Sequence, residues 1–283
     1  MTEVRLHVDA RFVVVDDAEL EVSDWGSGDP IVFVQTALIA DELIPLATQP
    51  ALRDGFRKIL YHRRGYTGSR GLERAGSIGR DADDVRSLLS AMGIPRAHIV
   101  GVSYSGAVAL QLAADAPECA QSLVVSEPPP VHTSLGPEFR AANERLVRIR
   151  HDRGVSAALE EFAAVLFGSD WRSFVEERLP GAVAQIERDA ITFFDRDIPA
   201  LLGWDFGPSE ASRIDCPVLY IGGTNSGPWF AAVRELILSW LPHAEDVQIE
   251  GAGHSLEITH TSEASAAVAE FLARHPITTG SSR

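Results

Sequence analysis

Short apolar runs alternate with longer amphipathic stretches over the first part of the chain and again after about residue 215. The short runs are rich in Val, Ile, Leu and Phe, which is typical of buried strands, and the longer stretches have apolar residues at helical spacing. Strands are expected at residues 12–15, 19–25, 31–34, 56–61, 97–100, 122–126, 217–221 and 246–250. Helices are expected at residues 43–47, 78–92, 103–114, 229–240 and 262–274. This alternation predicts an α/β fold in which helices flank a mostly parallel sheet.

The pattern changes between Glu127 and about Asp215. Three consecutive prolines, Pro128 to Pro130, interrupt the chain there. Helical stretches follow at residues 137–152, 155–167, 171–178 and 182–194. We interpret residues 128–214 as a helical cap (lid) domain, inserted into an α/β core domain made of residues 1–127 and 215–283.

Composition narrows the class of protein. The 283 residues are 45% hydrophobic and 23% charged, which is ample for a folded core, and the formal net charge is −15. A charge of this sign argues against nucleic acid or an anionic membrane as a partner. No segment approaches the roughly 20 apolar residues of a membrane span, and the acidic start, Met1 to Arg11, does not resemble a signal peptide. We therefore expect a cytoplasmic protein, in which the isolated Cys119 and Cys216 are free thiols.

The most informative motif is Gly101-Val102-Ser103-Tyr104-Ser105-Gly106, which lies between an expected strand and an expected helix. This is the pattern of a nucleophile elbow, where a serine on a tight strand-to-helix turn needs small residues two positions to either side. Gly101 and Ser105 occupy those two positions, and Ser105 departs from the glycine of the G-x-S-x-G pattern. The helix that begins at the serine directs free N–H groups toward a developing anion. Ser103 is therefore the candidate nucleophile.

Five segments together resemble the α/β-hydrolase fold over nearly the full length of the chain. They are Val32 to Gln35, His62 to Ser69, the elbow, Pro217 to Gly223, and Gly251 to His254, in the order and at the spacing of that family. The resemblance implies an eight-stranded, mostly parallel sheet with a helical cap inserted after the sixth strand. It defines the fold far better than the substrate, because this fold hosts many chemistries.

A serine nucleophile needs an imidazole to remove its proton. His254 follows the last expected strand in Gly251-Ala252-Gly253-His254, where the family places its catalytic histidine. The glycines there allow the loop to bring the ring over the carboxyl edge of the sheet. The histidines without such a setting are expected to be structural or solvated: His62, His98, His132, His243 and His260.

The acid that would orient His254 has two possible origins. The family usually places it after the seventh strand, but the segment from Gly222 to Ser226 has Asn225 and no carboxylate. An asparagine can orient an imidazole but cannot stabilise imidazolium, and such a change costs about four orders of magnitude in a triad. Glu127, at the end of the sixth expected strand, is the alternative, and it resembles the arrangement of zearalenone-type lactone hydrolases. We take Glu127 as the candidate acid, ahead of Asp215 and Asp246.

An oxyanion hole requires two backbone N–H groups. By resemblance, one belongs to Tyr104, immediately after the nucleophile, and the other to Ala37 in the loop after the third strand. Gln35 and Thr36 stand where family members often carry His-Gly. We expect the Gln35 side chain to hydrogen-bond across this loop.

Aromatic residues are dense in and just after the expected cap. They are Phe167, Trp171, Phe174, Phe193, Phe194, Trp204 and Phe206. We take Trp204, Trp171 and Leu38 as the candidate substrate-binding residues. A lid of this kind suits a mainly apolar ester or lactone.

These observations predict a cofactor-independent serine hydrolase of an apolar ester or lactone, with Ser103, His254 and Glu127 as the triad. Carbon–carbon bond hydrolysis of a β-diketone-like substrate and a non-catalytic ligand-binding role remain open alternatives. No cofactor or metal is expected, because the chain has neither an H-E-x-x-H motif nor a glycine-rich phosphate loop. The sequence leaves a homodimer open.

Overall fold

A computed structural model describes residues 10–71 and 75–278. The expectation about a signal peptide falls largely on residues 1–9, which lie outside the described residues. None of the described helices combines the length and the apolar composition that crossing a membrane requires.

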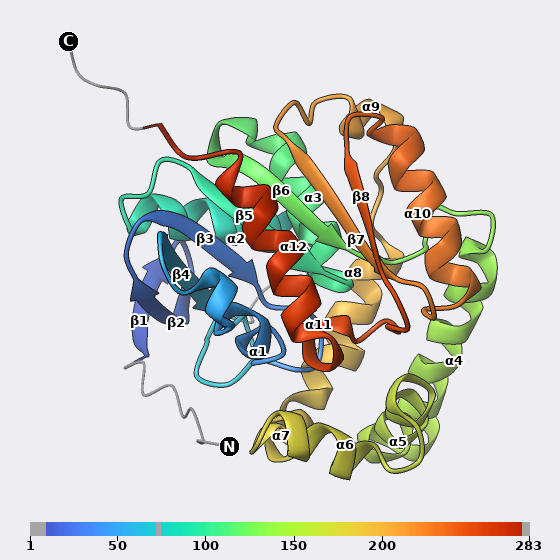
Figure 1. Cartoon of the computed structure of the whole chain (residues 1–283). Helices are drawn as coiled ribbons and strands as arrows, with labels where there is room; N and C mark the ends of the chain where they lie inside the picture. Colours follow the sequence, from blue (N-terminus) through green and yellow to red (C-terminus); the bar gives the residue numbers. More distant parts are fainter. Residues whose placement is uncertain (1–9, 72–74, 279–283) are drawn as a thin grey trace.

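Eight strands form one sheet in the order β1-β2-β4-β3-β5-β6-β7-β8 (Figure 1). Their bounds are β1 Arg11–Val15, β2 Ala18–Gly26, β3 Asp29–Val34, β4 Phe56–Tyr61, β5 Ala97–Val102, β6 Ala120–Ser126, β7 Val218–Gly223 and β8 Glu245–Ile249. The pairings of β2 with β1 and with β4 are antiparallel, and all others are parallel. The predicted α/β-hydrolase architecture is therefore confirmed, with each expected strand within a few residues of its observed bounds.

Successive residues of the central strands pack on opposite faces of the sheet. In β3, Val32 and Val34 join the apolar cluster that contains α2 (Ile78–Ala91), α3 (Tyr104–Asp115) and α10 (Pro228–Trp240). Ile31 and Phe33 join the cluster of the other face, with α1 (Ile44–Ala47), the 3-10 turn Pro50–Leu52 and α12 (Thr261–Ala273). Figure 1 shows α12 and α1 in front of the sheet and α2 and α3 behind it. Continuous Val, Ile and Phe runs are what a parallel sheet covered on both faces requires.

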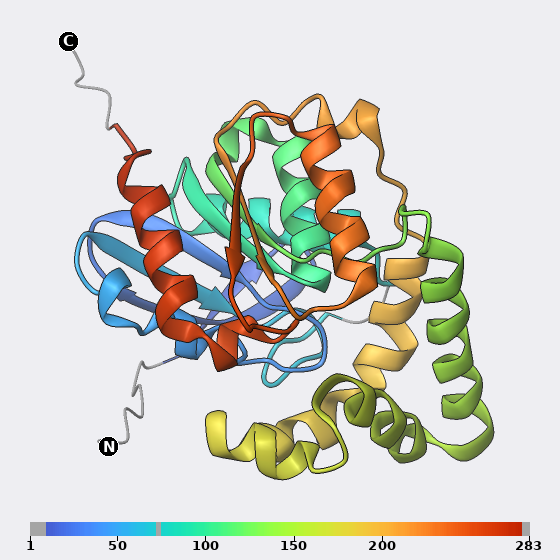
Figure 2. The same cartoon turned by 45° about the vertical axis from the view of Figure 1, so that its right-hand side comes forward.

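The helical segment between β6 and β7 lies beyond one end of the sheet (Figure 2). It contains α4 (Gly136–Arg153), α5 (Val155–Phe167), α6 (Trp171–Arg178), α7 (Ala182–Thr192), α8 (Ile198–Leu202) and α9 (Pro208–Ala211). A third apolar cluster joins helices α5 to α8 to Leu38 and Ile39 of the loop after β3. The division into a core domain and a cap domain stays a prediction.

The helix expected at residues 182–194 is longer than predicted. A π-helical turn, Phe193–Asp197, continues α7 directly into α8. Pro199 follows this turn closely, at the start of α8, and does not end the helical path. Two short helices, α9 and α11 (Leu256–Thr259), were also not expected.

His62, at the end of β4, lies between two carboxylates. Its Nδ1 is 3.1 Å from Glu21 Oε2 and its Nε2 is 2.9 Å from Asp41 Oδ1. Burial by itself disfavours the charged ring, but the hydrogen bonds to Asp41 and Glu21 outweigh it and raise the pKa of His62 to about 9. The hydrogen bond with His62 likewise outweighs burial at Glu21 and lowers the pKa of that carboxyl to about 2. His62 is thus structural, as expected.

The contacts of His62 with Glu21 and Asp41 predict that the free energy of unfolding depends on pH. Because folding raises the pKa of His62, its contribution is complete below about pH 6.5 and is lost as the pH rises toward about 9. Over that range, we expect the free energy of unfolding of the wild type to fall relative to that of a His62→Gln variant, in urea denaturation. Parallel curves for the two proteins would contradict this prediction.

Candidate active site

Ser103 occupies a strained turn between β5 and α3. Its φ of 51° and ψ of −121° are unusual for a residue with a side chain. Its N–H donates to the carbonyl of Ser126 at the end of β6, at 2.8 Å. A Cβ on Gly101 would lie 2.3 Å from the Ser105 carbonyl oxygen, so the turn requires glycine at position 101.

Ser105 replaces the usual glycine without disturbing the elbow. Its Oγ accepts a hydrogen bond from the Val102 N–H at 2.8 Å and donates to the Val102 carbonyl at 2.9 Å. The buried hydroxyl is therefore satisfied inside the turn itself, which explains why a polar side chain is tolerated there.

His254 connects Ser103 to Glu127. Its Nε2 is 3.1 Å from Ser103 Oγ, and its Nδ1 is 2.8 Å from Glu127 Oε2. Since a carboxylate only accepts hydrogen bonds, Nδ1 carries the proton and Nε2 is free to accept from the serine hydroxyl. The imidazole also stacks on the ring of Phe230, with centroids 3.8 Å apart. The three candidate residues from β5, β6 and the loop after β8 thus form one hydrogen-bonded chain.

Glu127 is held from both sides. It is 1% exposed, and its second oxygen, Oε1, accepts a hydrogen bond from the Gly223 N–H at 2.8 Å. A Cβ on Gly222 would lie 3.2 Å from that same oxygen. The end of β7, which lacks the family's usual acid, thus packs against the carboxylate that β6 supplies.

Asn225 points elsewhere. Its side-chain amide donates to the Gly251 carbonyl at 3.2 Å, and its backbone N–H donates to the Ala252 carbonyl. In the described part of the chain no hydrogen bond joins it to His254. Asn225 therefore stabilises the loop after β8, which contains His254.

The loop after β3 lies beside the nucleophile. Thr36 Oγ1 donates to the Val102 carbonyl at 3.0 Å, and Leu38, with φ of 66°, donates its N–H to the Tyr66 hydroxyl at 3.0 Å. Within the described residues, the N–H groups of Ala37 and Tyr104 donate to no other part of the backbone. Both residues border the same cavity as Ser103. The Ala37 and Tyr104 N–H groups therefore stay the predicted oxyanion donors.

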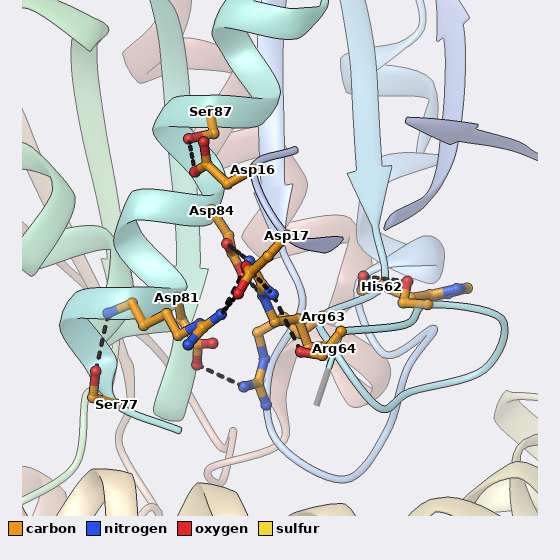
Figure 3. Close-up of polar contacts among 12 residues, drawn as sticks. Asp16, Asp17, His62, Arg63, Arg64, Ser77, Asp81, Asp84 and Ser87 are labelled. Carbon is orange, nitrogen blue, oxygen red and sulfur yellow. Dashed lines mark hydrogen bonds and ion pairs between the residues drawn. The ribbon is translucent and has the colours of Figure 1, made fainter. Parts of the chain in front are cut away.

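A buried arginine ties this loop to the elbow and to the cap helices. The Arg63 guanidinium is 2.8 Å from Asp81 on α2 and 2.6 Å from Asp197 in the π-helical turn. The Arg63 Nε also donates to the Gln35 carbonyl at 3.1 Å, and the Arg63 Cζ lies 4.2 Å from the centre of the Tyr104 ring. Figure 3 shows Arg63 directed at Asp81, with the neighbouring Arg64 contacting Asp84 and Asp17.

Two tyrosine hydroxyls donate further hydrogen bonds within the same network. Tyr66 donates to Asp197 at 2.5 Å, and Tyr104 donates to Asp81 at 2.7 Å. The Gln35 side chain, expected to hydrogen-bond across its own loop, instead reaches the segment after β4, where its Oε1 accepts the backbone N–H of Arg63 at 2.5 Å. Buried ions are stable only when they are paired and hydrogen-bonded, and the Arg63 guanidinium meets this condition through Nε and both terminal nitrogens.

A cavity of about 500 Å³ opens beside Ser103 and His254. Apolar and aromatic side chains form most of its wall: Leu38, Phe139, Leu146, Phe162, Val165, Phe193, Ile198, Leu201, Trp229 and Phe230. Leu38 thus lies where the sequence predicted it. A volume and lining of this kind suit a small organic molecule.

The predictions for Trp171 and Trp204 are wrong. Neither lines the cavity. The Trp171 indole donates to Glu160 at 3.0 Å and is buried among the cap helices. The Trp204 indole donates to Gln111 of α3 at 2.9 Å and packs against His132 and Phe206. Both indoles instead stabilise the packing between helices.

Four carboxyl groups in the cavity wall were not predicted from the sequence. Asp197 is paired with Arg63 and Glu161 with Arg145, whereas the other two have no such partner among the described residues. Glu42 precedes α1 and Glu257 lies on α11, and both are buried. Glu257 follows His254 by three residues, which is the only sequence signal that could have drawn attention to it. Among the described residues no group of three or more His, Cys, Asp or Glu side chains is arranged to hold a metal ion.

Comparisons with known proteins agree with this geometry. A family model described as the alpha/beta hydrolase fold matches residues 30–148. The putative carbamate hydrolase RutD of Caulobacter sp. (strain K31) is 30% identical over 78% of this chain and 82% of its own. A thermophilic esterase from Thermogutta terrifontis superposes with a TM-score of 0.75 at 19% identity, over 94% of this chain and 99% of its own. The enol-lactonase from Burkholderia xenovorans LB400 gives 0.74 at 23% identity, over 93% and 100%.

The chain belongs to the α/β-hydrolase family. The relatives and solved structures that it resembles are named as hydrolases.

The Arg63 network predicts a large loss of stability on substitution. Arg63→Met leaves Asp81 and Asp197 buried without their counter-charge, so we expect the free energy of unfolding to fall by about 3–5 kcal/mol in urea denaturation. Arg86→Met is the matched control, because Arg86 forms only an exposed ion pair with Asp83 and its loss costs about 0–1 kcal/mol. Equal losses in the two variants would contradict the structural role of Arg63.

Proposed function

We propose that the protein is a cofactor-independent serine hydrolase that cleaves a carboxylic ester or lactone of a mainly apolar small molecule. The observation that carries this proposal is the His254 ring, which lies within hydrogen-bond distance of both Ser103 Oγ and Glu127 Oε2 at the wall of an apolar cavity. A nucleophile, a base and an orienting acid in this order are the requirements of acyl transfer.

In the proposed mechanism, Ser103 Oγ attacks the carbonyl carbon of the substrate while His254 Nε2 takes its proton. Glu127 keeps the imidazole in the tautomer with the proton on Nδ1 and stabilises the imidazolium that forms. The oxyanion accepts hydrogen bonds from the N–H groups of Tyr104 and Ala37. The carbon–oxygen bond then breaks, and His254 protonates the leaving alkoxide. Water, deprotonated by His254, releases the acyl group and restores Ser103.

Carbamate hydrolysis is a second candidate, favoured by the name of the 30% identical relative. A carbamate carbonyl passes through the same tetrahedral intermediate, so the triad suits both substrates. Comparing kcat/KM for matched p-nitrophenyl esters and carbamates, alongside lactones of several ring sizes, separates the two candidates.

The triad proposal predicts the behaviour of two variants. Ser103→Ala should abolish both turnover of p-nitrophenyl esters and labelling by a fluorophosphonate. Glu127→Gln should lower kcat by about four orders of magnitude, because the wrong histidine tautomer is favoured. Glu263→Gln, the same substitution at an exposed position on α12, should retain activity.

Two results would refute parts of this assignment. Activity that survives Glu127→Gln but is lost in Asn225→Ala would show that Glu127 is not the acid. A folded protein that binds apolar ligands, yet never reacts with a fluorophosphonate, would support the non-catalytic alternative.

We predict that the Tyr66 hydroxyl affects catalysis although it does not contact the substrate. Tyr66→Phe removes the acceptor for the Leu38 N–H, next to the proposed oxyanion donor Ala37. Because one oxyanion donor contributes 10²–10³ in rate, we expect its misplacement to lower kcat by about tenfold with little change in KM. Tyr61→Phe is the control, since the buried Tyr61 hydroxyl has no partner among the described residues. An unchanged kcat in Tyr66→Phe would contradict the positioning role.

A further inference from the structure

Two buried carboxyl groups of the cavity take no part in the proposed mechanism and, unlike the buried Asp197, have no arginine partner among the described residues. Glu42 is 8% exposed and Glu257 is 1% exposed, yet both line the cavity that contains Ser103 and His254. They come from α11 and from the turn before α1, and these two short helices pack against each other. The two acids therefore belong to one region of the cavity wall, on the same side as the histidine loop.

Neither carboxyl has a cationic partner in the part of the chain that the structure describes. Glu257 Oε1 accepts a hydrogen bond from Ser126 Oγ at 3.1 Å, but its Oε2 has no partner there. Burial raises the pKa of both groups, and the charge of Glu42 raises that of Glu257 further. A positive charge held in the cavity would offset this effect, because it favours the ionised form of both carboxyl groups.

Such a pair is costly to the fold. Buried acids without counter-charge destabilise a protein, and apolar residues of similar size would pack at lower cost. The surrounding wall also contains the aromatic rings of Phe139, Phe162, Phe193 and Trp229, whose faces attract cations. By contrast, Arg145, the one arginine among the described residues that line the cavity, is already paired with Glu161. Carboxyl groups without a cationic partner and aromatic rings in one cavity are the features that recognise an alkylammonium.

We propose that Glu42 and Glu257 bind an alkylammonium group of the substrate while its ester carbonyl lies at Ser103. The inference rests on the proposed function, because it names the substrate class of that same cavity. The substrate would then be an ester or lactone whose apolar chain ends in a positively charged nitrogen.

Two esters of the same shape test this proposal. They are p-nitrophenyl 6-(trimethylammonio)hexanoate and its neutral isostere, p-nitrophenyl 7,7-dimethyloctanoate, in which carbon replaces the charged nitrogen. We expect the wild type to prefer the charged ester by about tenfold or more in kcat/KM, which corresponds to about 1.4 kcal/mol. Glu42→Gln and Glu257→Gln should each remove most of this preference. Because the preference is a ratio for one protein sample, it does not depend on the folded fraction.

Glu263→Gln, an exposed glutamate of α12, is the matched control and should keep the preference of the wild type. A wild-type ratio of kcat/KM for the charged and neutral esters near one overturns the inference, and no variant is needed for that result. A preference that survives both substitutions overturns it as well. In either case, turnover of the neutral ester through Ser103 would leave the proposed function intact. Failure to hydrolyse either ester, together with no fluorophosphonate labelling, would instead refute the proposed function and the inference with it.

Discussion

The candidate site depends on residues with a positive φ, which occur beyond the carboxyl ends of four adjacent strands. After β3, β4, β5 and β6, the residues Leu38, Thr67, Ser103 and Glu127 have φ values of 66°, 50°, 51° and 42°. Left-handed backbone in residues with side chains costs of order 1–3 kcal/mol each and persists only where surrounding packing offsets it. Such turns direct the serine, the carboxylate and the loop toward one another above the sheet.

The buried ions around Arg63 provide much of the support for these turns. One guanidinium contacts the loop after β3, the helix α2, the ring of Tyr104 and the π-helical turn before α8. Asp197 also lines the cavity, so the cap helices and the proposed oxyanion loop share a common anchor.

The origin of the acid follows from the sheet order. β6 and β7 are neighbours and run parallel, so their carboxyl ends lie side by side. A glutamate at the end of β6 can therefore reach the same imidazole nitrogen as an acid placed after β7. The end of β7 supplies no carboxylate here. Its Gly223 N–H instead donates a hydrogen bond to the Glu127 carboxylate. The two arrangements are geometrically equivalent solutions to one requirement.

The sequence alone determined the strands and the candidate nucleophile Ser103, because hydrophobic runs and a strand-to-helix turn mark them locally. The candidates His254 and Glu127 also required the family resemblance. The sequence-based prediction failed at Trp171 and Trp204 and missed Phe230, Glu42 and Glu257. The cap helices carry aromatic residues on several faces, and helical periodicity does not tell which face meets the cavity. Only the tertiary structure decided that, because a cavity is formed by side chains from segments that are distant in the chain.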